Sequence, residues 1–111
     1  MIEKTVLDYL NGSLSVPCYM EMPEEPSGSY VILEKTGSSV TNRIQKATFA
    51  IQSYADTLYD AAALNEDVKA AMENMIELDL ISRVELNSDY NYTDTDLKAY
   101  RYQAVFVITH Y

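Results

Sequence analysis

The residues best able to do nucleophilic or acid–base chemistry in this chain are few and stand apart. His110 is the single histidine and falls at the end of an expected strand, and Cys18 is the single cysteine. Neither has a partner at the spacing of a metal site or in a nucleophile–base motif. The three glycines are isolated, so no glycine-rich loop can cradle a phosphate. We interpret His110 as structural or solvated, Cys18 as a small apolar strand residue, and the chain as a non-enzyme without cofactors.

Four acidic residues near the C-terminus have the composition of a metal site: Glu85, Asp89, Asp94 and Asp96. Carboxylate oxygens are the ligands that Ca²⁺ and Mg²⁺ prefer, but the spacing differs from the EF-hand loop and no glycine supplies its turn. We favour a solvated acidic hairpin tip and expect no metal ion. The alternative, from a different functional class, is a small acidic metal- or ligand-binding domain that uses Asp89, Asp94 and Asp96.

Tyrosine dominates the aromatic residues, with ten Tyr, two Phe and no Trp. Four of the tyrosines fall near one expected turn: Tyr90, Tyr92, Tyr100 and Tyr102. Cross-strand pairing of their rings would hold the register of two strands. Tyrosine also suits protein–protein contacts, because its ring is apolar and its hydroxyl polar. We keep both interpretations and take these four as interface candidates, together with Asp94 and Asp96 between them.

These residues lie on an expected C-terminal β-hairpin. The pattern predicts strands at Ile81–Tyr92 and Lys98–Tyr111, joined by the acidic loop Thr93–Leu97. In the second strand every other residue from Tyr100 to Ile108 is apolar, as in a strand with one face on a core. In the first strand a period of two places four residues on one face: Val84, Leu86, Tyr90 and Tyr92.

The segments before this hairpin are expected to pack against it or extend it. A short amphipathic helix of about ten residues is expected at Ile2–Leu10, with Asn11-Gly12 as its stop. A strand at Val16–Met22 follows, at a sheet edge because Pro17 cannot donate a ladder hydrogen bond. The turn residues of Pro23–Gly28 predict a loop.

Two further strands are expected in the middle of the chain. Ser29–Lys35 is apolar on both faces, which is typical of a central strand that is covered on both sides. Gly37-Ser38-Ser39 is expected to break it. A long strand at Asn42–Ala55 follows, with three residues on its buried face: Ala47, Phe49 and Ile51.

The main helix is predicted from about Asp56 or Thr57, either of which can act as N-cap, to about Asp79. Six residues form its apolar stripe: Ala61, Leu64, Val68, Ala71, Met75 and Leu78. The order of helix, three strands, helix and two strands predicts one α+β domain over residues 1–111. We expect two layers, a mostly antiparallel sheet packed by one long helix, with a short N-terminal helix.

Charge and hydropathy disfavour several functional classes. The net charge of −9, from 17 acidic and 8 basic residues, disfavours a protein that grips nucleic-acid phosphates. No apolar run approaches the roughly 20 residues of a membrane-spanning helix. The start at Met1-Ile2-Glu3-Lys4 lacks the apolar core of a signal peptide, so we expect the chain to stay in the cytosol.

The C-terminal segment resembles that of the tail terminator proteins of long-tailed phages (siphophages), a family also called minor tail protein U-like or tail completion proteins. Three features carry the resemblance: the run Asp89-Tyr90-Asn91-Tyr92, a short acidic loop, and a last strand that ends in Phe106-Val107-Ile108-Thr109-His110-Tyr111. The residues resemble the family over Ser88–Tyr111, and the order of elements does so over nearly the whole chain. The chain is shorter than some members between its middle strand and main helix.

The resemblance implies a structural protein of a phage or prophage virion tail, assembled in the host cytoplasm. It implies a homo-oligomeric ring, usually of six copies, that caps the tail tube protein, ends tube polymerisation and offers its other face to the head connector or head completion protein. DNA would pass through the lumen without specific binding, and an acidic wall would repel its phosphates.

A closed ring needs two different patches that meet. We expect these patches at the two edges of the sheet. The loops Gly37–Thr41, with Ser38, Ser39 and Val40, and Thr93–Leu97 are expected to face neighbouring copies or the tube.

Other functions stay open. A head–tail joining or head completion protein is similarly small and forms a ring, and it would bind the portal side rather than tail tube subunits. A DNA mimic that inhibits a nucleic-acid enzyme is suggested by acidity alone.

Overall fold

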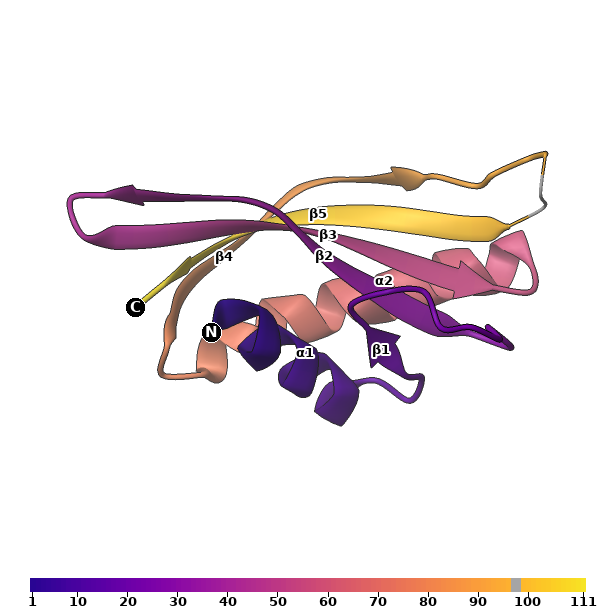
Figure 1. Cartoon of the computed structure of the whole chain (residues 1–111), viewed down its shortest axis with the longest axis horizontal. Coiled ribbons are helices and arrows are strands. Elements are labelled where there is room, and N and C mark those ends of the chain that lie inside the picture. Colours follow the sequence, from indigo (N-terminus) through magenta and orange to yellow (C-terminus); the bar gives the residue numbers. More distant parts are fainter. Residues whose placement is uncertain (97–98) are drawn as a thin grey trace.

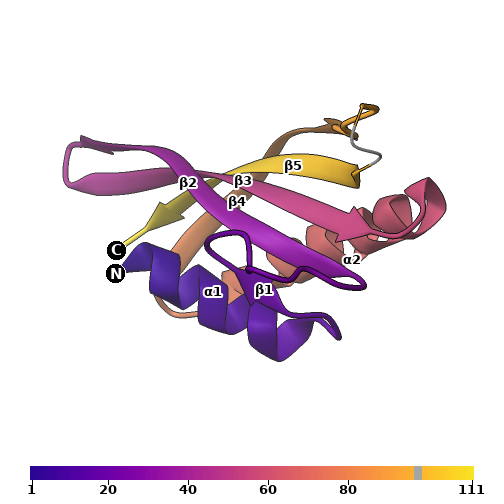
Figure 2. The same cartoon turned by 45° about the vertical axis from the view of Figure 1, so that its right-hand side comes forward.

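The strands of the chain form one twisted sheet, and both helices lie on the same face of it (Figures 1 and 2). The structure is a computed structural model that describes residues 1–96 and 99–111. The elements are α1 (Ile2–Ser13), β1 (Cys18–Tyr19), β2 (Tyr30–Thr41), β3 (Ile44–Ala55), α2 (Leu58–Asn74), the 3₁₀-helix η1 (Met75–Glu77), β4 (Ile81–Asn91) and β5 (Tyr100–His110).

The sheet has five strands in the order β1-β2-β3-β5-β4. Strand β1 runs parallel to β2, and the other neighbours are antiparallel. The predicted α+β class, the order of elements and the mostly antiparallel sheet with one long helix packed on it are therefore confirmed.

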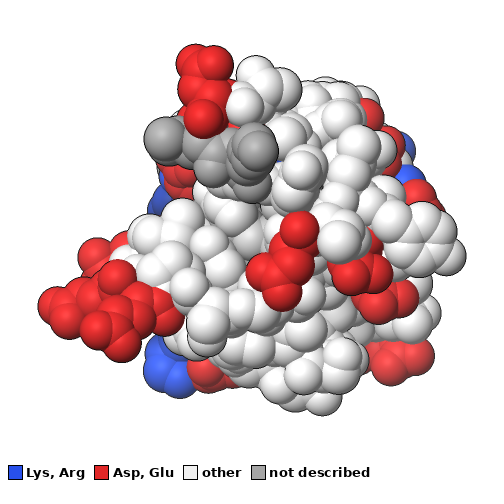
Figure 3. Space-filling view, turned by 90° about the vertical axis from the view of Figure 1, so that its right-hand side faces the viewer, with Lys and Arg blue, Asp and Glu red and all other residues white. Residues whose placement is uncertain are grey.

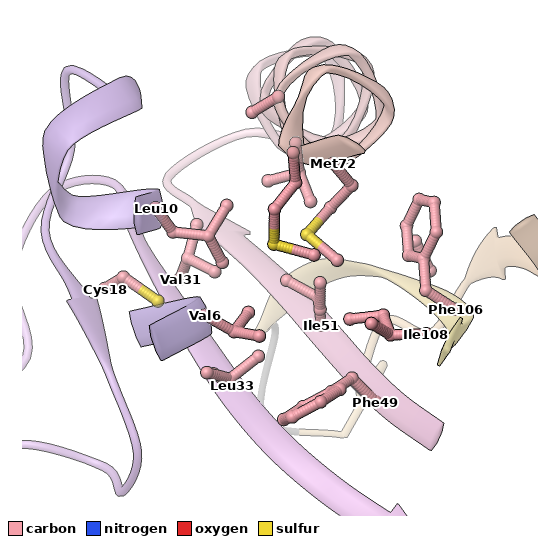
Figure 4. Close-up of a cluster of buried hydrophobic side chains, with 14 of the residues drawn as sticks. Val6, Leu10, Cys18, Val31, Leu33, Phe49, Ile51, Met72, Phe106 and Ile108 are labelled. Atoms are coloured by element: carbon pink, nitrogen blue, oxygen red, sulfur yellow. The ribbon is translucent and has the colours of Figure 1, made fainter. Parts of the chain in front are cut away.

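The core lies between the sheet and the helices. The period of two along β3 and β5 turns six residues toward α2, each at most 1% exposed: Ala47, Phe49, Ile51, Ala104, Phe106 and Ile108. The helices contribute further buried side chains: Val6, Leu10, Val68, Met72 and Met75 (Figure 4). The predicted buried faces of both strands and the apolar stripe of the main helix are confirmed, with Leu78 packed at the margin of the core.

Helix α2 begins where its cap residue predicts. The Thr57 side chain accepts a hydrogen bond from the Asp60 backbone N–H at 3.1 Å, so Thr57 is the N-cap. The α-helix ends at Asn74, and η1 adds one tighter turn to Glu77, so the helical segment stops slightly before the predicted end at about Asp79. The chain becomes extended at Leu78 because it must turn back into β4.

The predicted break at Gly37-Ser38-Ser39 is wrong, because β2 continues to Thr41. The register with β3 shifts at a bulge between Lys35 and Gly37, and pairing with β3 resumes after the bulge. Asn42 and Arg43, at φ 51° and 67°, close a tight hairpin. Positive φ at both turn residues is what a two-residue hairpin loop requires. The predicted loop Gly37–Thr41 is therefore a strand.

The N-terminal segment differs from its predicted layout in two places. The expected strand Val16–Met22 is reduced to Cys18–Tyr19, although its edge position is confirmed. Asn11 does not stop α1, which runs to Ser13. Instead, the Asn11 amide donates to the Cys18 carbonyl at 3.1 Å and accepts from the Cys18 N–H at 2.9 Å. These two bonds satisfy the N–H and the carbonyl of Cys18 on the side of β1 that faces away from β2.

The C-terminal hairpin is confirmed, but one of its predicted faces is wrong. Leu86 lies opposite Phe106 and Tyr90 lies opposite Gln103, with a bulge between Leu86 and Ser88. The extra residue at the bulge reverses the side-chain alternation. Val84 and Leu86 therefore share the helix side of the sheet, while Tyr90 and Tyr92 lie on the other side. Leu97 and Lys98, the predicted end of the loop and start of the second strand, lie outside the described residues.

No helix within residues 1–96 and 99–111 is long and apolar enough to cross a membrane.

The cap of α2 gives a test of this packing. Thr57→Ala should lower the free energy of unfolding by about 1 kcal/mol, because the Asp60 N–H loses its acceptor. Thr57→Ser keeps a hydroxyl and should stay close to wild type. Urea unfolding followed by circular dichroism measures both variants, and equal losses for Ala and Ser would contradict the capping role.

Candidate functional site

The interface candidates fall into two groups at opposite ends of the sheet. Tyr90, Tyr92, Asp94, Asp96, Tyr100 and Tyr102 lie at the end where β3 leads into α2, because Ala55 pairs with Tyr100. Ser38, Ser39 and Val40 lie near the β2–β3 turn at the other end. Twelve residues of β3 separate the two ends, and a strand rises about 3.3 Å per residue. The structure therefore provides two separate surfaces.

The four C-terminal tyrosines divide between the faces of the sheet. Tyr90 and Tyr92 lie on the face away from the helices, which we call the outer face. Tyr102 lies on the helix side, where it lines a hollow with Tyr59 and Ala62 of α2. These tyrosines are close in sequence, but they do not form one cluster in the structure.

A row of five tyrosines and one arginine crosses all five strands on the outer face, and we call it the aromatic row: Tyr19, Tyr30, Tyr54, Arg101, Tyr92 and Tyr90. Tyr30 and Tyr54 stack with ring centroids 4.8 Å apart and an interplanar angle of 8°. Tyr90 and Tyr92 meet edge to face at 5.9 Å. The cross-strand ring pair is thus Tyr30–Tyr54, rather than a pair within the C-terminal hairpin.

Arg101 joins the two halves of the aromatic row. Its guanidinium carbon lies 4.5 Å from the Tyr92 ring centroid, a cation–π distance. Its Nε donates to the Tyr92 carbonyl at 2.7 Å, and another guanidinium nitrogen donates to the Tyr54 hydroxyl at 2.8 Å. These fixed directions suit a planar guanidinium. The alternation of polar and apolar residues along β5 gives no sign of this role for Arg101.

The inner part of the aromatic row is structural, and its ends are accessible. Tyr30 and Tyr54 are 8% and 6% exposed, and burial raises the pKa of the Tyr30 hydroxyl. Tyr90 and Tyr92, at the edge strand β4, are 42% and 43% exposed. Only the ends of the row can therefore meet a partner.

Asp89 is held on the helix side of β4 rather than in an acidic group. Its Oδ2 lies 2.9 Å from Lys69 Nζ and accepts from the Asn65 amide at 3.0 Å. The Lys69 hydrogen bond holds the pKa of Asp89 below its ordinary value of 3.8, and partial burial opposes this shift. Lys69 also pairs with Glu66, and both carboxylates raise the pKa of Lys69.

The metal-binding alternative finds no support in this geometry. Asp89 faces α2, whereas Glu85 pairs with Val107 on the outer face and Asp94 and Asp96 lie in the turn. Asp94 accepts from the Asp96 backbone N–H at 3.0 Å. Among residues 1–96 and 99–111, no three His, Cys, Asp or Glu side chains are placed to hold a metal ion.

The acidic side chains of the turn belong to a larger acidic end. Loop residues Pro26–Gly28, Asp56 and Ala99 line one hollow, which places three segments side by side. We define the acidic end by the acidic residues of these segments: Glu24, Glu25, Asp56, Asp60, Asp94 and Asp96. Figure 3 looks onto this end and shows Asp and Glu side chains outnumbering Lys and Arg.

The opposite end of the sheet is a projecting arm, which we define as residues 36–46 of the β2–β3 hairpin (Figure 1). Every residue of the arm is exposed, including Val40 at 69% and Ile44 at 51%. The arm carries Arg43 and Lys46 and no acidic residue. Sequence patterns did not predict this hairpin, because a break was expected in β2 and Asn42-Arg43 lacks the glycine of the usual two-residue hairpin turns.

The residues with nucleophilic potential take structural places. Cys18 is buried in the core, and burial raises the pKa of its thiol to about 12. The thiol therefore stays protonated near neutral pH, and Cys18 acts as the small apolar residue that was predicted. The His110 ring lies against the Tyr111 carbonyl, with Nδ1 at 3.1 Å.

Comparison of the chain with models of known protein families gives no match, and comparison with curated proteins also gives none. The functional interpretation therefore rests on the sequence and on this geometry.

Arg101→Lys tests the aromatic row. We expect the free energy of unfolding to fall by about 1–2 kcal/mol, because an ammonium cannot bond Tyr92 and Tyr54 while stacking on a ring. Arg83→Lys, at an exposed pair with Glu85, is the control and should cost less than about 0.5 kcal/mol. Denaturant unfolding measures both, and unchanged stability of Arg101→Lys would contradict the role of the guanidinium.

Asp89→Asn gives a test that depends on pH. A folded pKa below 3.8 means that the carboxylate stabilises the fold above that value and loses its effect as pH falls through the folded pKa. We expect Asp89→Asn to lower the free energy of unfolding by about 0.5–1 kcal/mol at neutral pH. This difference should vanish in acid, where wild-type Asp89 is also neutral.

The matched control is Glu66→Gln, which removes the other partner of Lys69. The Glu66 side chain is 70% exposed, against 29% for Asp89, so its loss should change stability little at any pH. A pH series of unfolding curves measures both variants. A difference for Asp89→Asn that persists at low pH would show that the charge is not the cause.

Proposed function

We propose that this chain is a structural phage or prophage tail protein that forms a ring on the end of the tail tube. The ring would end tube polymerisation and provide the surface for head attachment. Its partners would be other copies of the chain, the tail tube protein, and the head connector or head completion protein. It would act in the virion tail after assembly in the host cytoplasm.

The observation that carries this proposal is a sheet with two open and unlike edges. Among the residues that the structure describes, strand β4 has no neighbouring strand on its outer side, and most of its residues are exposed. On the other side, β1 covers β2 only at Val31 and Ile32, so the edge of β2 is open from Leu33 onward. Open edges present unpaired backbone groups that can bind another chain. Two unlike patches suit the heterologous contact that closes a ring.

The edges also differ in how strongly they resist pairing. β4 has two bulges and carries Arg83, Glu85 and Asp89, and bulges and charges are devices that hinder uncontrolled pairing of an edge. Near its start the open edge of β2 carries Glu34 and Lys35 next to one bulge, but its outer part from Thr36 to Thr41 carries no charge. If one edge resists pairing and the other allows it, copies of the protein would associate in one orientation.

The charge of the chain fits a ring that DNA passes through. Each copy carries a net charge of −9. A lumen wall of that sign would repel phosphates, so DNA would slide through without being bound. This part of the proposal requires carboxylates at the lumen, and a ring with its acidic residues directed outward would remove it.

The test is tail length in lysates of the phage or prophage that encodes the chain, with the gene deleted, by negative-stain electron microscopy. We expect overlong, variable tails without heads, because tube growth would have no stop. Tails of normal length beside unjoined heads would instead assign the chain to head–tail joining. Normal infectious particles would contradict both functions, and complementation with the intact gene is the control.

A further inference from the structure

Every residue of the arm is exposed, and the arm lies at one end of the long axis of the molecule, which measures 44 Å (Figure 1). At its base the arm pairs with β5, where Gln45 lies opposite His110 and Lys46 opposite Thr109. Within the described residues neither Arg43 nor Lys46 takes part in an ion pair. An exposed arm with two unpaired cations and two exposed apolar side chains has the composition of a docking element.

The acidic end offers the complementary surface on the same molecule. Glu24, Glu25, Asp56 and Asp60 are exposed, and none of them makes an ion pair within the described part of the chain. Beside Asp60, the side chains of Tyr59, Ala62 and Tyr102 line a largely apolar hollow. Tyr59 is 82% exposed.

We propose that the arm of one copy docks on the acidic end of a second copy, with Arg43 and Lys46 facing Asp56 and Asp60. Ile44, between the two cations in sequence, packs near the hollow lined by Tyr59. Because the arm and the acidic end lie at opposite ends of the long axis, each copy keeps one free end after the first contact. Repetition of the contact joins copies head to tail.

A second copy fits the arm better than nucleic acid does. Two cations are a small electrostatic footprint for a phosphate backbone, and a chain with a net charge of −9 would repel the rest of it. The acidic end, in contrast, is present once for every arm. Like charges would repel each other if two arms met or if two acidic ends met. The charges therefore select the contact of an arm with an acidic end.

This inference rests on the proposed function in one respect, since a head-to-tail contact serves a ring. Its test uses charge exchange in the full chain. Arg43→Glu with Lys46→Glu reverses the arm, and Asp56→Lys with Asp60→Lys reverses the acidic end. All four positions are exposed, so the variants should fold, which circular dichroism and thermal unfolding would verify.

Sedimentation equilibrium then measures self-association of each protein at low salt. We expect wild type to associate, and each charge-reversed variant alone to associate at least about tenfold more weakly. An equimolar mixture of the two variants should regain association, because every contact in an alternating assembly again joins opposite charges. Association of wild type should weaken at high salt.

The control is Lys4→Glu, which reverses a cation on α1, outside the arm, the acidic end and both open edges of the sheet. Lys4 pairs locally with Asp8, and the control should associate like wild type. A monomeric wild type, an arm variant that associates normally, or a mixture that stays monomeric would each overturn the docking contact.

The two proposals can fail separately. A chain that stays monomeric in solution, but whose deletion gives overlong tails, would overturn this contact and leave the tail function standing. A chain that associates head to tail, but whose deletion leaves tails and infectivity normal, would overturn the tail function and leave this contact standing.

Discussion

The rest of the structure depends on the unbroken pairing of β3 with β5. Their register runs from Gln45 opposite His110 to Ala55 opposite Tyr100 without a shift, whereas β2 and β4 each carry bulges. A continuous ladder keeps side-chain alternation constant, so one face of this pair supplies the core beneath α2. The strands β2 and β4 on either side of this pair can therefore carry bulges. These bulges redirect side chains of β2 and β4 without disturbing the core.

The bulges decide what the molecule presents to its surroundings. The bulge in β4 turns Tyr90 and Tyr92 onto the outer face, where Arg101 can stack against Tyr92. The bulge in β2 lets that strand continue past the core as the arm. Without them, Tyr90 and Tyr92 would point to the helix side, and the exposed outer edge would lose its aromatic side chains.

The distribution of charge matters more here than its total. The chain is acidic overall, yet its arm carries two cations and no acidic residue. The two ends of the long axis therefore differ in sign, and an asymmetric molecule of this kind favours directional association over symmetric pairing.

The sequence by itself determined the α+β class, the order of the elements, the start of α2 at Asp56 or Thr57 as N-cap, and the buried faces of β3, β5 and α2. These features follow from periods of two and of three to four residues and from local capping chemistry, which neighbouring residues control. The tertiary structure decided which faces Tyr90, Tyr92 and Tyr102 occupy, the full length of β2, and the role of Arg101. A bulge shifts the register by one residue and becomes visible only against a partner strand, and the partners of Arg101 come from strands that are distant in sequence. The separation of the arm from the acidic end likewise depends on how the strands pair, because the residues of the acidic end come from three separate segments of the chain.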